Sequence, residues 1–296
     1  MSSSPDPMYL VGLEIAGVSI SIQCFRKWTD EISFIPFMKS VENPDFRVTF
    51  RLKEKLPELP EDIIHEDNCY RIHPDGKGGV LRSFFDAPRD YSPYAVAQCD
   101  YQNGSVIIDC LPKGEKCVSE MHNSFFHIGF EKMLIHKKRL CLHAACVNTP
   151  LGGILFSGPS GIGKSTQSEL WCRYRKAFEI NGDRPILSKS QNGWFAWGAP
   201  YAGSSKTHVN VSCPVRAVVI LQQAKECSLQ RLKANEAFRA DWSELTVQLW
   251  DRYFVEEASN LTLDLVKTVP VFRFYCTPDE NAVEYLEREL RKECFE

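Results

Sequence analysis

Apolar and polar residues alternate with period two in the first part of the chain, and this alternation predicts β-strands. Residues 8–23 form one or two such runs, residues 46–53 repeat the pattern, and residues 106–108 are the centre of a further strand. Between the runs lie turn signals, and residues 54–67 are rich in Pro, Glu and Asp, which is typical of a surface connection. The pattern predicts an antiparallel, β-rich domain over residues 1–115.

The pattern changes after residues 112–115, which we take as the domain boundary. Residues 119–136 carry apolar side chains at helical spacing. Beyond them, short apolar runs alternate with helical patterns. The predicted strands cover 140–147, 153–157, 177–180, 217–221 and 269–274, the predicted helices cover 166–175, 236–260 and 281–294, and Asn192-Gly193 is the turn of a hairpin. Alternating strands and helices are typical of an α/β domain, here residues 116–296, in a chain that is α+β overall.

Composition places the chain among folded globular proteins. It has 296 residues, of which 44% are hydrophobic and 25% are charged, and its length suits two domains. A net charge of −3 does not indicate nucleic-acid binding. The apolar segment after the first seven residues contains Glu14 and alternates, so it resembles a strand rather than a signal peptide or a membrane span. The 12 cysteines include no CxxC pair, which favours free thiols in a reducing compartment. We therefore expect a cytoplasmic protein with neither nucleic acid nor membrane as a partner.

The strongest motif runs from Gly158 to Ser165 and matches G-x-x-x-x-G-K-S/T at every fixed position. Glycines let successive backbone N–H groups point at phosphate oxygens, Lys164 reaches the β- and γ-phosphates, and the hydroxyl of Ser165 can bind Mg²⁺. A predicted strand precedes the motif and a predicted helix follows it, which is the expected context. The sequence therefore predicts binding of ATP and Mg²⁺. The expected nucleotide-binding residues are Gly158, Pro159, Ser160, Gly161, Ile162, Gly163, Lys164, Ser165 and Thr166.

Two further residues are candidates for the chemistry. Asp183 follows a short apolar strand, where such sites place a second magnesium ligand besides Ser165. The alternative is that Asp183 only starts a turn with Asn181 and Gly182. His143 lies on an apolar strand and is a candidate proton acceptor, although a lone histidine in such a strand is more often a satisfied core residue.

Three segments resemble HPr kinase/phosphorylase and, more distantly, phosphoenolpyruvate carboxykinase. Leu142-His-Ala-Ala-Cys-Val147 is similar to the family's strand with a histidine shortly before the loop, and His143 lies 15 residues before Gly158. The loop has the Gly-Pro-Ser-Gly-Ile-Gly-Lys-Ser form, and Ile180-Asn-Gly-Asp-Arg-Pro-Ile-Leu187 is similar to the family's strand that ends in an Asp-Asp pair. The resemblance covers about residues 120–296 and does not extend to the first 115.

The resemblance implies a kinase that moves the γ-phosphoryl group of ATP to a hydroxyl, often that of a serine. It implies catalytic roles for His143, Lys164 and Asp183. In the family the first Asp of the pair is the candidate base and the second helps to bind metal, but here Gly182 holds the first place and Asp183 the second. The base is thus open between His143 and Asp183, and phosphorolysis is not expected to carry over. The family often assembles into multimers, so the resemblance leaves the oligomeric state open and includes a homo-oligomer among the possibilities.

The expected acceptor is a hydroxyl of a protein, peptide or small molecule, and two alternatives to a kinase stay open. One is a catalytically weak ATP-binding sensor or scaffold, since Gly182 replaces the expected carboxylate; the other is an ATPase or a nucleotide-dependent enzyme with another acceptor. Residues 198–206 form a Gly- and Ser-rich loop that is a candidate cover for the phosphates or the acceptor, or else a plain surface loop. Lys206 and Arg216 are weaker candidates for neutralising transition-state charge. Residues 1–115 are a candidate acceptor-binding or oligomerisation domain.

Overall fold

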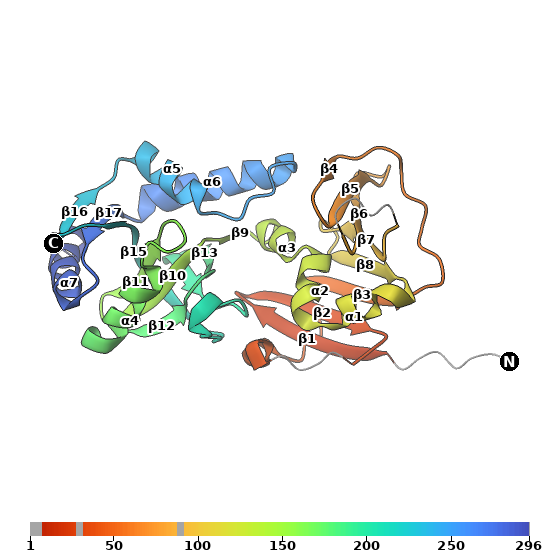
Figure 1. The fold of residues 1–296 in the computed structure, drawn as a ribbon, viewed down its shortest axis with the longest axis horizontal. Helices are drawn as coiled ribbons and strands as arrows, with labels where there is room; N and C mark the ends of the chain where they lie inside the picture. Colours follow the sequence, from red (N-terminus) through yellow and green to blue (C-terminus); the bar gives the residue numbers. More distant parts are fainter. Residues whose placement is uncertain (1–7, 28–31, 88–91, 296) are drawn as a thin grey trace. The chain divides into compact units, whose positions relative to one another are not determined.

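The computed structural model describes residues 8–27, 32–87 and 92–295, so the first seven residues of the expected N-terminal domain lie outside the described part. The chain divides into two compact units, Met1–His136 and Lys137–Glu296 (Figure 1). Both units contain a sheet and helices, so the protein has a mixed α/β fold.

The first unit contains an eight-stranded sheet in the order β1-β2-β3-β8-β7-β6-β5-β4. A tight turn at Ala16 and Gly17, both with positive φ, joins the first two strands into a hairpin. The antiparallel prediction is wrong at β3, which runs parallel to both β2 and β8. Parallel neighbours need a long crossover connection, and local turn signals do not reveal which strands it brings together. The strands are β1 (Tyr9–Ile15), β2 (Val18–Cys24), β3 (Phe46–Leu52), β4 (His65–Glu66), β5 (Tyr70–Pro74), β6 (Val80–Phe84), β7 (Ala95–Asp100) and β8 (Ser105–Cys110), with a short 3₁₀ turn at Ile32–Phe37.

Three short helices complete the first unit: α1 (Glu115–Ser119), α2 (Met121–Ile128) and α3 (Phe130–His136). The Tyr94 hydroxyl lies 2.8 Å from Nε2 of His127, and the Tyr101 hydroxyl donates to the carbonyl of Ile128 at 3.0 Å. These contacts join α2 to β7 and its flanking residues, so the compact units divide after His136 rather than at residue 115. The single helix expected over residues 119–136 is interrupted because Gly129, at φ 66°, ends α2 in the left-handed conformation.

The second unit contains a nine-stranded mixed sheet in the order β12-β10-β11-β15-β14-β13-β9, with β17 pairing with β15 and β16 beside it. The pairs β11–β15 and β15–β17 are parallel, and the others are antiparallel. The sequence did not indicate β16. The strands are β9 (Arg139–Cys141), β10 (Ala144–Thr149), β11 (Gly152–Ser157), β12 (Phe178–Asn181), β13 (Ile186–Ser190), β14 (Gly193–Trp197), β15 (Ser212–Gln223), β16 (Ser228–Arg231) and β17 (Val271–Cys276).

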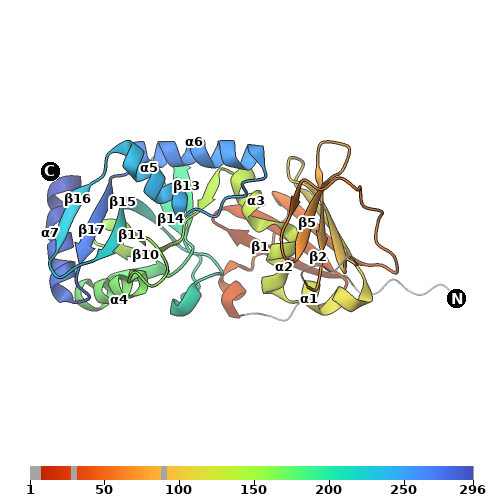
Figure 2. The same ribbon diagram turned by 45° about the horizontal axis from the view of Figure 1, so that its top comes forward.

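Helices cover both faces of this sheet. Figure 2 shows α4 (Lys164–Arg175) on one side of it and α5 (Ala234–Ser243) with α6 (Arg252–Thr268) on the other. The last helix, α7 (Glu280–Phe295), packs beside α4. Among the described residues, every helix is too short or too polar to cross a lipid bilayer.

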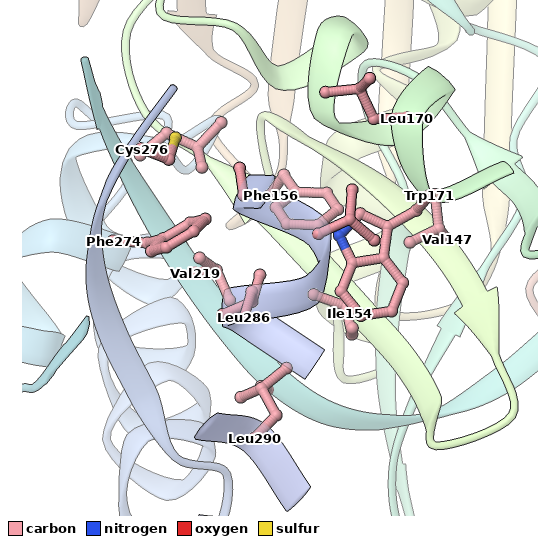
Figure 3. Packing of buried hydrophobic residues seen from close by; sticks show 14 of the residues in the cluster. Val147, Ile154, Phe156, Leu170, Trp171, Val219, Phe274, Cys276, Leu286 and Leu290 are labelled. Atoms are coloured by element: carbon pink, nitrogen blue, oxygen red, sulfur yellow. The ribbon is translucent and has the colours of Figure 1, made fainter. Parts of the chain in front are cut away.

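One hydrophobic cluster joins β11, α4, β17 and α7. Phe156 and Trp171 lie within 6.4 Å between ring centroids, and Phe274 and Leu286 belong to the same buried cluster (Figure 3). Both neighbours of the Gly158–Ser165 loop, the strand before it and the helix after it, are therefore anchored in the same core.

We predict that Leu286→Ala lowers the free energy of unfolding of the second unit by about 2–5 kcal/mol, because it removes a fully buried side chain and leaves a cavity. Five of the six tryptophans follow residue 136, so denaturant unfolding followed by tryptophan fluorescence reports on this unit. Leu263→Ala, at an exposed position on α6, is the control and should change stability by less than about 0.5 kcal/mol. Equal effects of the two substitutions would contradict the assigned core.

Asp241 on α5 should make the stability of the folded protein depend on pH. Its side chain is fully buried, neither carboxylate oxygen has a hydrogen-bond partner within the described part of the chain, and burial raises its pKa to about 7. The folded state therefore binds the proton more tightly than the unfolded chain does. The contribution of Asp241 to stability is fully present below about pH 4 and is lost by about 1.4 kcal/mol per unit as the pH rises towards 7.

Asp241→Asn removes this titration, so the unfolding free energy of the variant relative to the wild type should rise between pH 4 and pH 7. Denaturant titrations of both proteins across that range measure the difference. A difference that stays constant with pH would show that Asp241 does not titrate in this way.

Candidate active site

The Gly158–Ser165 loop joins β11 to α4. Its glycines Gly158, Gly161 and Gly163 have φ values of 133°, 79° and 116°, which side-chain-bearing residues rarely adopt. A Cβ atom added at Gly161 or Gly163 would meet no atom within 4 Å, so open space adjoins the loop. The N-terminus of α4 begins at Lys164, directly after the loop. This geometry fits a loop that presents backbone N–H groups and a helix N-terminus to an anion.

The loop side chains differ in exposure. Pro159 and Ser160 are exposed, as is Thr166 beyond the motif, whereas Ile162 and Ser165 are half-buried. Lys164 is 8% exposed, and its Nζ donates to the carbonyls of Gly158 at 2.8 Å and Pro159 at 3.1 Å. The ammonium group therefore lies inside the curve of the loop, where phosphate oxygens would compete with these carbonyls for it.

Charged groups from two other segments of the chain act on Lys164. Burial lowers the pKa of Lys164, whereas the negative charges of Glu244 and Asp183 raise it and the positive charge of Arg184 lowers it. These residues come from the turn after β12 and the segment after α5. The fold thus brings the loop lysine, two carboxylates and an arginine into one electrostatic neighbourhood.

His143 occupies a break between two strands. The single strand expected over residues 140–147 divides into β9 and β10, because β9 pairs with β13 whereas β10 pairs with β11 and β12. In this break, Nδ1 of His143 lies 2.9 Å from a carboxylate oxygen of Glu244, and Nε2 lies 3.5 Å from Oδ1 of Asp183. The side chain is 24% exposed. His143 is therefore a partly accessible ring between two carboxylates rather than a core residue.

Asp183 lies in a turn that the side chain of Asn181 holds. Oδ1 of Asn181 accepts hydrogen bonds from the backbone N–H groups of Asp183 at 3.0 Å and Arg184 at 2.6 Å. The expected turn is thus present, and it leaves the Asp183 carboxylate 31% exposed. Nε of Arg184 lies 3.5 Å from Oδ2 of Asp183, and Nη1 of the same arginine donates to Thr246 at 2.6 Å. The turn therefore holds a carboxylate in place without burying it.

Glu244 is the site residue that the sequence did not indicate. The helix expected over residues 236–260 is interrupted between Ser243 and Arg252, and the intervening segment runs beside the break that contains His143. The backbone N–H of His143 donates to the carbonyl of Glu244 at 2.9 Å, and Leu142 forms an isolated bridge with Leu245. The sequence did contain one signal that a new helix begins after this segment. Aspartate is a common N-cap, and Asp251 caps α6 by accepting a hydrogen bond from the N–H of Phe254 at 3.0 Å.

The loop at residues 198–206 packs against the Asp183 turn. The side-chain amide of Asn181 donates to the carbonyl of Tyr201 at 2.6 Å, and a Cβ added at Gly182 would lie 2.2 Å from Oγ and 2.6 Å from Cβ of Ser205. An aspartate at position 182 would therefore collide with this loop in its present position. With the 198–206 loop in this place, position 182 has room for glycine but not for a carboxylate side chain.

Lys206 and Arg216, the two weaker basic candidates, lie in different parts of the second unit. Lys206 is exposed at the end of the 198–206 loop. Arg216 lies beside Gly152, where an added Cβ would approach Cγ of the arginine to 2.4 Å. Gly152 begins β11, whereas the Gly158–Ser165 loop follows the end of that strand, so Arg216 lies at the opposite end of β11 from the loop.

Ser165, in the first turn of α4, and Asp183, in the turn after β12, are the two expected magnesium ligands, and both side chains are half-buried. A hydroxyl and one carboxylate are the oxygen donors that Mg²⁺ takes from a protein when substrate phosphates complete its coordination. Among the described residues, no group of three His, Cys, Asp or Glu side chains is arranged to hold a metal ion by itself. A metal bound at this site would therefore depend on phosphate oxygens as well.

We predict that Gly182→Ala lowers stability by about 1–3 kcal/mol, because the new methyl group overlaps Ser205 and displaces the 198–206 loop. The double variant Gly182→Ala/Ser205→Gly should recover part of the loss, and Ser205→Gly alone is the control. Thermal or denaturant unfolding measures each step. A Gly182→Ala protein as stable as the wild type would show that the loop does not press on this turn.

Comparison with known proteins gives structural likenesses and no match to a family model or a curated protein. Among solved structures, the chain is similar to the Hpr(Ser) kinase/phosphatase from Coxiella burnetii, with 14% sequence identity and a TM-score of 0.31. The match covers 52% of this chain and 89% of that one. A likeness at this level assigns no family.

Proposed function

We propose that this protein is an ATP-dependent kinase that transfers the γ-phosphoryl group to a hydroxyl, with a serine of a protein or peptide as the first acceptor to test. One observation carries the proposal: the loop lysine lies in the electrostatic field of Glu244, Asp183 and Arg184, with His143 between the two carboxylates. Phosphoryl transfer requires placement and charge neutralisation more than covalent help from the protein.

The loop supplies the binding part of this function. Backbone N–H groups between Gly158 and Ser165 and the N-terminus of α4 would hold the phosphates. Nζ of Lys164 would exchange its bonds with the carbonyls of Gly158 and Pro159 for oxygens of the β- and γ-phosphates. Because β11 and α4 are anchored in one hydrophobic cluster, the loop can bind the phosphates without rearranging its ends.

Ser165 and Asp183 would hold Mg²⁺, which supplies neutralising charge at the phosphates when it is bound. Asp183 is suited to this role because it is partly exposed and its turn is fixed by Asn181. The acceptor proton then has two candidate destinations, Asp183 and His143, because Gly182 has no side chain that could take it.

The alternative function, an ATP-binding sensor or scaffold with weak turnover, has its own support. The collision that a side chain at position 182 would meet with Ser205 shows that the 198–206 loop occupies the place of the carboxylate expected from the resemblance. Such a protein would bind ATP through the same loop but would release little ADP. The residues of the first unit are the proposed acceptor-binding or oligomerisation part in either case.

We predict that Lys164→Ala weakens ATP binding and lowers phosphoryl transfer by at least about 100-fold, because it removes the ammonium group that the loop carbonyls hold and that would bind the phosphates. Asp183→Asn should lower transfer by a similar factor and reduce the effect of Mg²⁺ on ATP affinity. Calorimetric titration with ATP and Mg²⁺ and an ADP-release assay with serine peptides and small hydroxyl acceptors measure both effects.

Lys189→Ala is the matched control, since Lys189 pairs with Asp264 away from the loop and should leave both measurements unchanged. A wild-type chain that binds ATP but releases no ADP with any acceptor would favour the sensor. A wild-type chain that does not bind ATP with Mg²⁺ would refute both functions.

A further inference from the structure

Glu244 makes two independent contacts with one residue. Its carboxylate lies 2.9 Å from Nδ1 of His143, and its backbone carbonyl accepts the N–H of the same histidine at 2.9 Å. The side chain of Glu244 is only 14% exposed. A carboxylate held this close to one ring nitrogen, with its own backbone tied to that residue, fixes the orientation of the ring.

The segment around Glu244 is itself held in place. Leu245 bridges Leu142, the N–H of Thr246 donates to the carbonyl of Cys141 at 3.3 Å, and the Thr246 hydroxyl accepts from Arg184 at 2.6 Å. Residues 244–246 thus form a short strap along the break between β9 and β10. Its threonine is connected through Arg184 to the turn that holds Asp183.

An ionised carboxylate is only an acceptor of hydrogen bonds, so the contact with Glu244 places a proton on Nδ1 of His143. In a neutral ring, the other nitrogen then carries the lone pair. Nε2 is also the nitrogen on the Asp183 side of the ring, at 3.5 Å from that carboxylate. Without Glu244, the same ring would gain more by placing its proton on Nε2 and donating it to Asp183.

We propose that Glu244 is a positioning residue that keeps the proton of His143 on Nδ1, so that Nε2 is the atom that receives the acceptor's proton. This inference rests on the proposed function. As the acceptor oxygen bonds to the γ-phosphorus, the bond from phosphorus to the departing ADP oxygen breaks, and the hydroxyl proton passes to Nε2. The negative charge of Glu244 would then balance the imidazolium ion, and the Asp183 carboxylate would be left to hold a magnesium ion when one is bound.

The test separates position from charge with two variants of the full chain. Glu244→Gln keeps an oxygen that can accept from Nδ1 but removes the charge, and Glu244→Ala removes both. The ring of His143 is observed by ¹⁵N NMR of histidine-labelled protein at alkaline pH, with His143→Gln to assign the signals. Glu257→Gln is the control, because Glu257 is a similarly buried carboxylate that pairs with Lys138 instead of the site.

We expect the wild type and Glu244→Gln to carry the proton on Nδ1 and Glu244→Ala to carry it on Nε2. ADP release per enzyme should fall by about 10-fold in Glu244→Gln and by about 100-fold in Glu244→Ala, within the range of general base contributions, with unchanged ATP affinity. The control should match the wild type in both measurements.

A ring proton on Nδ1 in Glu244→Ala, or undiminished turnover in that variant, would overturn the role of Glu244. The NMR measurement needs no nucleotide, so it tests the effect of Glu244 on the His143 ring even if the wild type fails to bind ATP. Failure of ATP binding would count against the proposed kinase, whereas failure of the ring proton to move would count against Glu244 alone.

Discussion

Burial of β11 and α4 in one hydrophobic cluster is the constraint on which the site depends. Three glycines of the loop between them adopt left-handed conformations, and open space adjoins two of these glycines. Such a loop would have many conformations if its ends were free. Phe156 at one end and Trp171 at the other are both packed in the cluster that β17 and α7 complete, so both ends of the loop are held by the same core. The packing that stabilises the second unit therefore also places the backbone N–H groups and Lys164.

Electrostatic balance explains why the loop lysine tolerates burial. An isolated ammonium group at 8% exposure would lose much of its hydration. Two loop carbonyls accept its hydrogen bonds, and the charges of Glu244 and Asp183 favour its protonated form against the effect of burial. The same two carboxylates lie on either side of His143. These two carboxylates thus act on both the loop lysine and the histidine.

The 198–206 loop adds a steric condition to this arrangement. Ser205 leaves no room for a side chain at position 182, so the turn after β12 can offer one carboxylate and not two. Asn181 connects the two segments, since its oxygen holds the Asp183 turn and its nitrogen holds the carbonyl of Tyr201. The proposed kinase would need another group to take the acceptor proton, and Nε2 of His143 lies 3.5 Å from the Asp183 carboxylate.

The sequence by itself predicted the elements that local patterns control. Strand alternation located the strand residues of β1 and β2 without deciding between one strand and two, the Asn192-Gly193 signal located the turn between β13 and β14, and the loop motif located the β11–α4 connection. Each of these depends on residues close together in the chain. Only the tertiary structure decided the parallel pairing of β3, the break at His143 and the place of Glu244. Glu244 is 101 residues from His143 along the chain, and the two meet because the strap after α5 crosses the gap between β9 and β10. Contacts of that kind depend on how separate elements pack, and no local pattern of apolar and polar residues records them.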